Sequence, residues 1–273
     1  MSSTTSRKKN RVTIKDVATA AEVSIATVSY VLNNTPGQSI SEDTRKKVLQ
    51  FANILGYECN IMARYLATGK TNTVAVVTKD IDGFGAQYYF KLITELSRLL
   101  YRKSFTLKLA DYSDEITRSV ETCDAYITVA LSEKEFREFA DTKYNPVIAI
   151  DSMFEDFLFY RINDNYAELC RKAKRELNSN AVALLTFGLT PECEAAANRT
   201  FDKVVTVKTL ADIARLDGDC GYATTCKAIS DCADKTVYLE SASFALKASA
   251  AVDAVIKAIN RIQSSSEEHD IRV

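Results

Sequence analysis

Hydrophobic residues recur at helical spacing in three short segments near the N-terminus. The pattern predicts helices over residues 13–21, 24–33 and 41–55. Each segment begins with a hydroxyl side chain that can cap a helix: Thr13, Ser24 and Ser41. Asp16 forms a capping-box-like pair with Thr13, and Gly56 follows the third segment, where a left-handed residue commonly ends a helix. Three short helices with tight joints are the minimum for a helix-turn-helix unit.

The second predicted helix has two faces of different character. At about 100° per residue, one arc carries Val28, Val31 and Leu32 and can pack inward. The opposite arc is uncharged and mostly small, and consists of Ile25, Ala26, Ser29, Tyr30 and Asn33. Small side chains allow a helix to approach base edges closely, whereas a solvated face usually carries charge. The pattern favours contact with DNA; a bundle face covered by the rest of the protein is the alternative.

From Val74 onward, short apolar runs alternate with amphipathic segments. The runs predict strands over 74–77, 106–110, 125–131, 147–150, 181–187, 204–207 and 236–239. The amphipathic segments predict helices over 85–102, 164–177 and 245–262. Strands separated by helices indicate a parallel sheet and therefore an α/β fold. The polar run 263–273 is expected to be disordered.

Composition narrows the function classes. Hydrophobic residues make up 47% of the 273 residues and charged residues 26%, as in globular proteins. There is no apolar run of the ~18–20 residues that cross a bilayer, and no apolar stretch behind the basic N-terminus like that of a secretory signal. We therefore expect a cytoplasmic protein without membrane contact. The seven cysteines include no Cys-x-x-Cys pair, and the single histidine, His269, lies in the polar C-terminal run. We expect no metal, no cofactor and no enzymatic activity.

Charge is distributed unevenly along the chain. Residues 1–73 carry ten Lys and Arg against five Asp and Glu, whereas the remaining residues carry 25 against 31. A small basic piece on a large acidic one indicates that the small piece meets a polyanion. Chance clustering of surface charge would give the same numbers.

Several stretches resemble a known family. Residues 12–33, from Val12-Thr-Ile-Lys-Asp-Val to Val-Ser-Tyr-Val-Leu-Asn33, closely resemble the N-terminus of LacI/GalR (lactose-repressor-type) regulators. The resemblance continues through 41–48, 55–57, 63–67 and 73–77. It implies a three-helix helix-turn-helix headpiece and a hinge helix. It also implies a periplasmic-binding-protein-like, two-lobed parallel α/β domain, here shortened.

In that family the second helix enters the major groove. The resemblance assigns to this groove Ile25, Ala26, Thr27, Ser29, Tyr30 and Asn33, with Ile25, Ala26 and Tyr30 at base-reading positions. It assigns to the DNA backbone Thr13, Ile14, Ser24 and Asn60. Thr13 and Ile14 would bring the N-terminus of the first helix near a phosphate. Glu22 stands where the family often has a small turn residue.

The family's hinge helix corresponds to residues 60–68. This segment is too short to hold a helix alone in water, so it would become ordered only on docking. By resemblance it docks in the minor groove, where Leu66 is the apolar wedge, Ala63 allows two hinge helices to pack across a dimer, and Arg64 lies beside them. Cys59 stands where the family usually has proline. The alternative is that Leu66 is a linker residue packed on the α/β domain.

The α/β part resembles the family's effector domain less closely. Asp164-Asn165-Tyr166 resembles a signature between the lobes, but the resemblance thins over 188–235, where Arg199 is the candidate remnant of an effector-binding arginine. Asp80, Asp82 and Phe84 follow the first strand. They are compatible with one wall of a pocket for a sugar-like or nucleoside-like effector, and equally with an exposed loop.

These observations predict a sequence-specific DNA-binding transcription regulator. We expect a repressor that reads a pseudo-palindromic operator as a homodimer and is tuned by a small metabolite. The alternative is a small-molecule-binding protein with vestigial DNA binding. The predicted divisions are a flexible basic arm at 1–11, a helix-turn-helix domain at 12–58, a hinge helix and linker at 59–72, an effector and dimerisation domain at 73–262, and a disordered tail at 263–273.

Overall fold

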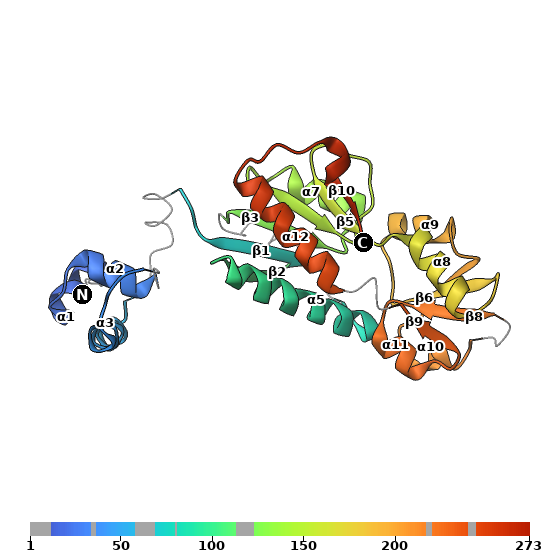
Figure 1. Cartoon of the computed structure of the whole chain (residues 1–273), viewed down its shortest axis with the longest axis horizontal. Coiled ribbons are helices and arrows are strands. Elements are labelled where there is room, and N and C mark those ends of the chain that lie inside the picture. Colours follow the sequence, from blue (N-terminus) through green and yellow to red (C-terminus); the bar gives the residue numbers. More distant parts are fainter. Residues whose placement is uncertain are drawn as a thin grey trace, which may run out of the picture. The chain divides into compact units, whose positions relative to one another are not determined.

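The chain forms two compact units, Met1–Gly69 and Lys70–Val273, which are described separately (Figure 1). The computed structural model describes residues 12–33, 37–57, 69–79, 81–112, 123–216, 220–239 and 244–273. The predicted basic arm at 1–11 and the hinge segment at 59–68 lie outside these ranges. Within them, no helix combines the length and the apolar character needed to cross a membrane.

The N-terminal unit consists of the three predicted helices, α1 (Ile14–Ala21), α2 (Ile25–Leu32) and α3 (Glu42–Leu55). Each begins at its predicted cap, because the side chain of Thr13, Ser24 or Ser41 accepts a backbone N–H from the first turn. Gly56 ends α3 in the left-handed region, with φ of 65°. Apolar side chains from all three helices form the core: Val17, Ala18, Ala21, Val28, Val31, Val48 and Ala52.

The second unit contains two parallel sheets, which define two lobes. The first lobe is built on a six-stranded sheet in the order β10-β5-β4-β3-β1-β2. Its strands are β1 (Thr73–Thr78), β2 (Thr106–Asp111), β3 (Ala125–Val129), β4 (Val147–Ile150), β5 (Tyr160–Asn163) and β10 (Asp270–Arg272). Among the described residues, the helices that pack on this sheet are α5 (Gly83–Arg102), α7 (Glu133–Ala140) and α12 (Phe244–Ile259).

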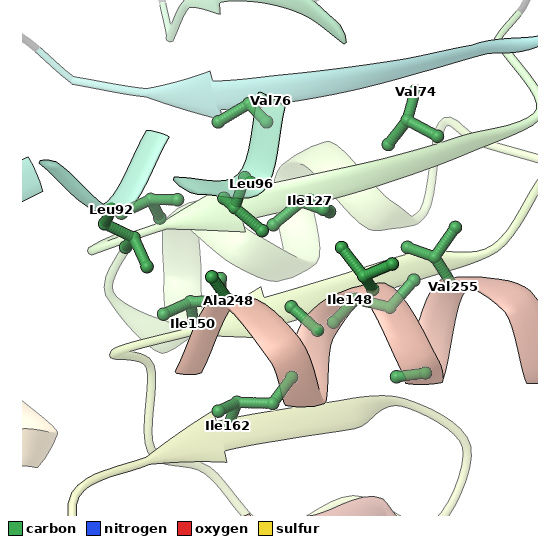
Figure 2. Close-up of a cluster of buried hydrophobic side chains, with 14 of the residues drawn as sticks. Val74, Val76, Leu92, Leu96, Ile127, Ile148, Ile150, Ile162, Ala248 and Val255 are labelled. Carbon is green, nitrogen blue, oxygen red and sulfur yellow. The ribbon is translucent and has the colours of Figure 1, made fainter. Parts of the chain in front are cut away.

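Apolar alternation along the central strands supplies both faces of the first sheet. On one face, Val74 and Val76 pack with Leu92 and Leu96 of α5 and with Ala248 and Val255 of α12 (Figure 2). On the other face, side chains of β1, β3 and β4 pack with Phe136 and Phe139 of α7. Because the strands are covered on both faces, each of them is a continuous apolar run in the sequence.

The second lobe is built on a four-stranded parallel sheet in the order β7-β6-β8-β9. Its strands are β6 (Val182–Thr186), β7 (Lys203–Thr206), β8 (Gly221–Thr224) and β9 (Thr236–Tyr238). Side chains of α8 (Tyr166–Glu176) and α9 (Pro191–Asn198) cover one face, and those of α10 (Leu210–Ile213) and α11 (Lys227–Cys232) contribute to the other. The chain enters this lobe after β5 and returns to the first lobe after β9 (Figure 1).

The prediction of a disordered tail at 263–273 was wrong. A 3-10 helix, η2 (Ser266–His269), leads into β10, which pairs in parallel with β5 and sets Ile271 opposite Ile162. The backbone of Val273 also exchanges hydrogen bonds with Asn163 and Asn165 at the crossing between the lobes. Composition suggested disorder, but the Ile271 side chain packs on the core of the first lobe, and the edge of β5 supplies partners for the backbone.

The predicted strands and long helices agree with the structure to within a few residues. The predicted elements did not include β5, β8 and β10 or the helices α7, α9, α10 and α11. The two missed internal strands are four residues each, and β5 includes a buried arginine, Arg161. Neither strand is a run of apolar β-branched residues, because β5 includes this charge and β8 begins with glycine, so the pattern gave no signal.

Candidate DNA interface and inter-lobe cleft

The predicted base-reading residues lie on one exposed face of α2. Ile25 and Tyr30 are 48% and 37% exposed, and Ala26 is also exposed, whereas Val28 and Val31 are buried in the core of the headpiece. The inward and outward arcs are therefore those that the periodicity predicted. A helix that projects an uncharged, partly apolar face can lie against base edges without burying an unpaired charge.

Polar side chains flank this face and are held by local hydrogen bonds. Ser24 Oγ accepts the Thr27 backbone N–H at 3.0 Å and lies 2.9 Å from Thr27 Oγ1. Asn33 Nδ2 donates to Ser29 Oγ at 3.1 Å. Thr27 and Ser29 are half-buried, while Ser24 and Asn33 are exposed. These four side chains are positioned before any ligand arrives, which lowers the entropic cost of binding.

The N-terminus of α1 is closed by its own capping box. Asp16 Oδ2 accepts from the backbone N–H and from Oγ1 of Thr13, each at 2.8 Å. These backbone and side-chain hydrogen bonds lower the pKa of Asp16. The Asp16 carboxylate thus already occupies the hydrogen-bond donors of Thr13 and would repel a phosphate there. The backbone N–H groups of the first turn, starting at the half-buried Ile14, are better donors to a phosphate.

The turn between α1 and α2 contains Glu22 in a left-handed conformation. Its φ is 55°, a region in which a side chain is strained and glycine is favoured. The Glu22 carboxylate accepts from Lys47 Nζ of α3 at 2.8 Å, and this contact lowers the pKa of Glu22. The ion pair is exposed, so it offsets little of the backbone strain.

Replacing Glu22 with glycine is expected to stabilise the headpiece. Relief of the left-handed strain should slow hydrogen exchange of the α1 and α2 amides in the full chain by about threefold. Glu22→Gln is the matched control, because it removes the charge and keeps the backbone strain. Equal protection in the two variants would show that the charge of Glu22, rather than its backbone, limits the stability of the turn.

The other predicted DNA contacts lie outside the described residues. They are Asn60, Ala63, Arg64 and Leu66 of the hinge segment. Their assignment continues to rest on the resemblance alone.

In the second unit, three charged side chains meet in the cleft between the lobes. Lys247 Nζ, on the first turns of α12, lies 2.6 Å from Asp151 Oδ1 and 2.8 Å from Asp164 Oδ1. Asp151 directly follows β4, and Asp164 directly follows β5. The Lys247 side chain is only 1% exposed, and both aspartates are buried. We call these three residues the Lys247 cluster.

The pKa values in the cluster follow from burial and from the mutual charges. Burial acts to lower the pKa of Lys247, but the carboxylates of Asp151 and Asp164 outweigh it and hold the pKa well above its ordinary value. Burial raises the pKa of Asp164 to about 6, although Lys247 opposes the shift. Lys247 is therefore a cation in the folded protein, and Asp164 is the group that titrates near neutrality.

Aromatic side chains fill the space around the cluster. Tyr88 and Tyr89 of α5 contact Phe187 of the second lobe, with ring centroids 4.9 Å and 5.5 Å apart. Lys247 Nζ lies 5.5 Å from the centroid of the Tyr88 ring. The free volume that remains among these side chains is about 10 Å³, close to what one water molecule needs.

The three predicted effector residues that the structure describes, Asp82, Phe84 and Arg199, do not line this cavity. Asp82 is exposed at the N-cap of α5, and Phe84 packs into the core of the second lobe. Arg199 is exposed at the end of α9. Since β6 and β7 are parallel, α9 returns from the cleft edge of the sheet to the opposite edge, and Arg199 lies there. Asp80 lies outside the described residues.

Sequence reasoning missed Asp151 and Lys247 and assigned Asp164 only to a family signature. The available signal was weak: an aspartate directly after a buried strand, and one lysine in the apolar first half of the last helix. A long lysine side chain in such a position usually extends to solvent. Only the packed structure shows that Lys247 points inward.

Comparison with known proteins agrees with the geometry of the N-terminal unit. Residues 13–60 match the family described as bacterial regulatory proteins, lacI family. The transcriptional regulator RegA of Clostridium saccharobutylicum is 32% identical over 151 residues, which cover 55% of this chain and 40% of RegA. Catabolite control protein A of Priestia megaterium is 40% identical over 106 residues, covering 38% of this chain and 30% of that protein. The chain thus spans less than half the length of these relatives.

Solved structures share the fold. A lac repressor dimer bound to operator and the anti-inducer ONPF superposes with a TM-score of 0.64 at 15% identity, covering 97% of this chain and 96% of that chain. The transcriptional regulator CelR in complex with cellobiose gives a TM-score of 0.55 at 14% identity, covering 96% of each chain. The helix-turn-helix geometry of the N-terminal unit agrees with the lacI-family match over residues 13–60, and the solved structures share the fold of the chain.

Proposed function

We propose that this chain is a sequence-specific DNA-binding transcription regulator that acts as a repressor. The observation that carries the proposal is the uncharged, exposed face of α2, held by its cap in a unit that matches the lacI family. The names of the relatives and the operator complex of the lac repressor support the same role. A role on DNA places the protein in the cytoplasm, and it requires no enzymatic activity and no cofactor.

In this proposal some residues of α2 contact the bases and others contact the DNA backbone. Ile25, Ala26 and Tyr30 contact base edges, where apolar contacts and the Tyr30 hydroxyl distinguish the base pairs. The polar side chains beside them, with the N-terminus of α1, fix the helix on the backbone: Thr13, Ile14, Ser24, Thr27, Ser29 and Asn33. The hinge residues Asn60, Ala63, Arg64 and Leu66 are proposed, by resemblance, to reach the backbone and the minor groove.

A homodimer is part of the proposal. Phe90 and Tyr101 are 71% and 78% exposed on α5. They lie eleven positions apart, and this spacing puts both side chains on the same face of the helix. Leu109 is exposed on the edge strand β2 of the same lobe. An apolar helix face beside an open sheet edge is a common site of association between two copies of a chain. Two copies would present two headpieces to the half-sites of a pseudo-palindrome.

The proposal is tested by binding of the full chain to DNA from the region upstream of its own gene, with increasing salt. Contacts with about four to eight phosphates should make the affinity fall steeply with the logarithm of salt concentration. A complete pseudo-palindrome should bind much more tightly than a half-site. Equal affinity for the operator and for random DNA at every salt concentration would contradict the proposal.

Tyr30→Ala is expected to alter base preference. Loss of a base contact should cost about tenfold or more in affinity for the operator and leave the salt dependence unchanged, because no phosphate contact is removed. The measurement is a comparison of operator and base-substituted operator by fluorescence anisotropy. Tyr144→Ala, which removes an exposed tyrosine of the second unit outside the proposed dimer face, is the matched control. If Tyr30→Ala binds like the control, the assigned reading face is wrong.

A further inference from the structure

The cleft between the lobes lies where parallel α/β sheets usually bind small ligands. Such ligands occupy the crevice beyond the carboxyl ends of the strands. Here Asp151 and Asp164 follow the carboxyl ends of β4 and β5, and Phe187 follows that of β6 in the opposite lobe. Two carboxylates and an aromatic plate are the groups that hold the polar atoms and the ring faces of a small polar ligand.

A side chain of the protein itself already satisfies these carboxylates. The ammonium of Lys247 reaches both of them, at 2.6 Å and 2.8 Å, and the same ammonium faces the ring of Tyr88. The cation thus has the contacts that a bound ligand would have, with two acceptors and an aromatic face. The remaining volume of about 10 Å³ is far below the ~300 Å³ of a small-molecule site.

The two lobes also contact each other directly beside the Lys247 cluster. A Cβ placed on Gly83, at the start of α5, would lie 2.6 Å from the backbone oxygen of Lys208 in the second lobe. Cys226 Sγ of the second lobe lies 3.8 Å from the backbone oxygen of Phe84. Phe187 packs against the apolar cores of both lobes. Among the described residues, these direct contacts close the part of the cleft that surrounds the Lys247 cluster.

We propose that Lys247 is a built-in occupant of the ligand site, which holds the second unit in its closed arrangement without a small-molecule effector. In this view the ammonium neutralises the two carboxylates that an effector would otherwise have to satisfy. The consequence for DNA rests on the proposed function: operator affinity would not respond to sugars or nucleosides. The alternative role, a small-molecule-binding protein with vestigial DNA binding, is not favoured by a filled cleft.

The test is chemical rescue in the full chain. Lys247→Ala removes three methylene groups and the ammonium, and n-propylammonium restores the same atoms. The variant should unfold at a lower temperature than the wild type, and millimolar n-propylammonium should recover part of the loss. The uncharged 1-propanol should not, because it cannot pair with the carboxylates. Lys257→Ala, which removes a half-exposed lysine of the same helix, should lose little stability and should not respond.

Two outcomes would overturn the proposal. One is equal stabilisation of Lys247→Ala by propanol and propylammonium, which would mean that the lysine only fills space. The other is a clear rise in the unfolding temperature of the wild type with any member of a panel of monosaccharides, disaccharides and nucleosides. Neither readout involves DNA, so these results are independent of the operator experiment.

A second set of variants keeps the test decisive if Lys247→Ala does not fold. Lys247→Met leaves two buried carboxylates without a cation, whereas Lys247→Met combined with Asp151→Asn and Asp164→Asn is neutral throughout. The neutral triple variant should fold and unfold near the wild-type temperature, since an uncharged replacement of a buried ion cluster is often tolerated. If the triple variant is as unstable as Lys247→Met, the charges of the cluster are not what holds the cleft closed.

Discussion

Replacing Ala26 with glutamate is expected to lower operator affinity by about 100-fold, because it sets a carboxylate against the negatively charged duplex. The headpiece should remain folded. Ala26 is exposed at the second position of α2, where a negative charge interacts favourably with the helix dipole, and the Ser24 cap is unchanged. Affinity is measured by anisotropy at low and high salt, with circular dichroism as the check on folding.

The matched control is Gln50→Glu, which adds the same charge at an exposed position of α3. It should weaken binding only slightly, through the general charge of the headpiece, and high salt should remove the difference. If both variants lose affinity equally, α2 has no special place in the complex. The reading face would then have to be sought elsewhere on the headpiece.

The second large effect concerns pH and Asp164. Burial raises the pKa of this carboxyl to about 6, above its ordinary value of 3.8. The folded state therefore binds the proton more tightly than the unfolded state does. The contribution of Asp164 to stability is fully present below the unfolded pKa and is lost as pH rises through about 6. Asp164→Asn should remove this loss and raise the free energy of unfolding at about pH 7.5 by roughly 3 kcal/mol.

The measurement is urea unfolding of the second unit, followed by the near-ultraviolet dichroism of its tyrosines, at pH ~5 and ~7.5. The titration of Asp164 should make the free energy of unfolding of the wild type larger at the lower pH. In Asp164→Asn the difference in free energy of unfolding between the two pH values should be smaller. Asp253→Asn, an exposed aspartate of α12, controls for the loss of surface charge. A variant that is less stable than wild type at both pH values would show that the Asp164 carboxylate is a net stabilising partner of Lys247.

Local signals made the headpiece predictable. The caps at Thr13, Ser24 and Ser41 bond to groups only three residues away, and the buried face of α2 follows from helical geometry alone. These interactions depend little on the rest of the chain. The same reasoning located the long helices and the fully buried strands of the second unit, because their apolar runs are longer than chance produces.

The errors lie where distant parts of the chain decide the structure. β10 is a strand because β5 offers an open edge, and β5 was itself missed because Arg161 interrupts its apolar pattern. Arg199 was assigned to the cleft from its place in the sequence, but the parallel order of β6 and β7 carries it to the far edge of the sheet. Neither fact can be read from a local pattern.

The sequence by itself determined a helix-turn-helix unit, the face of α2 that it presents, and a parallel α/β domain behind it. These features depend on short-range interactions and patterns, namely helix caps, helical periodicity and apolar runs. Only the tertiary structure decided the state of the cleft. Lys247 and Asp151 are 96 residues apart and meet because α12 packs against the ends of β4 and β5. Whether a buried charge is paired depends on that packing, since a lone lysine in an apolar helix is compatible with either a solvated or a buried ammonium.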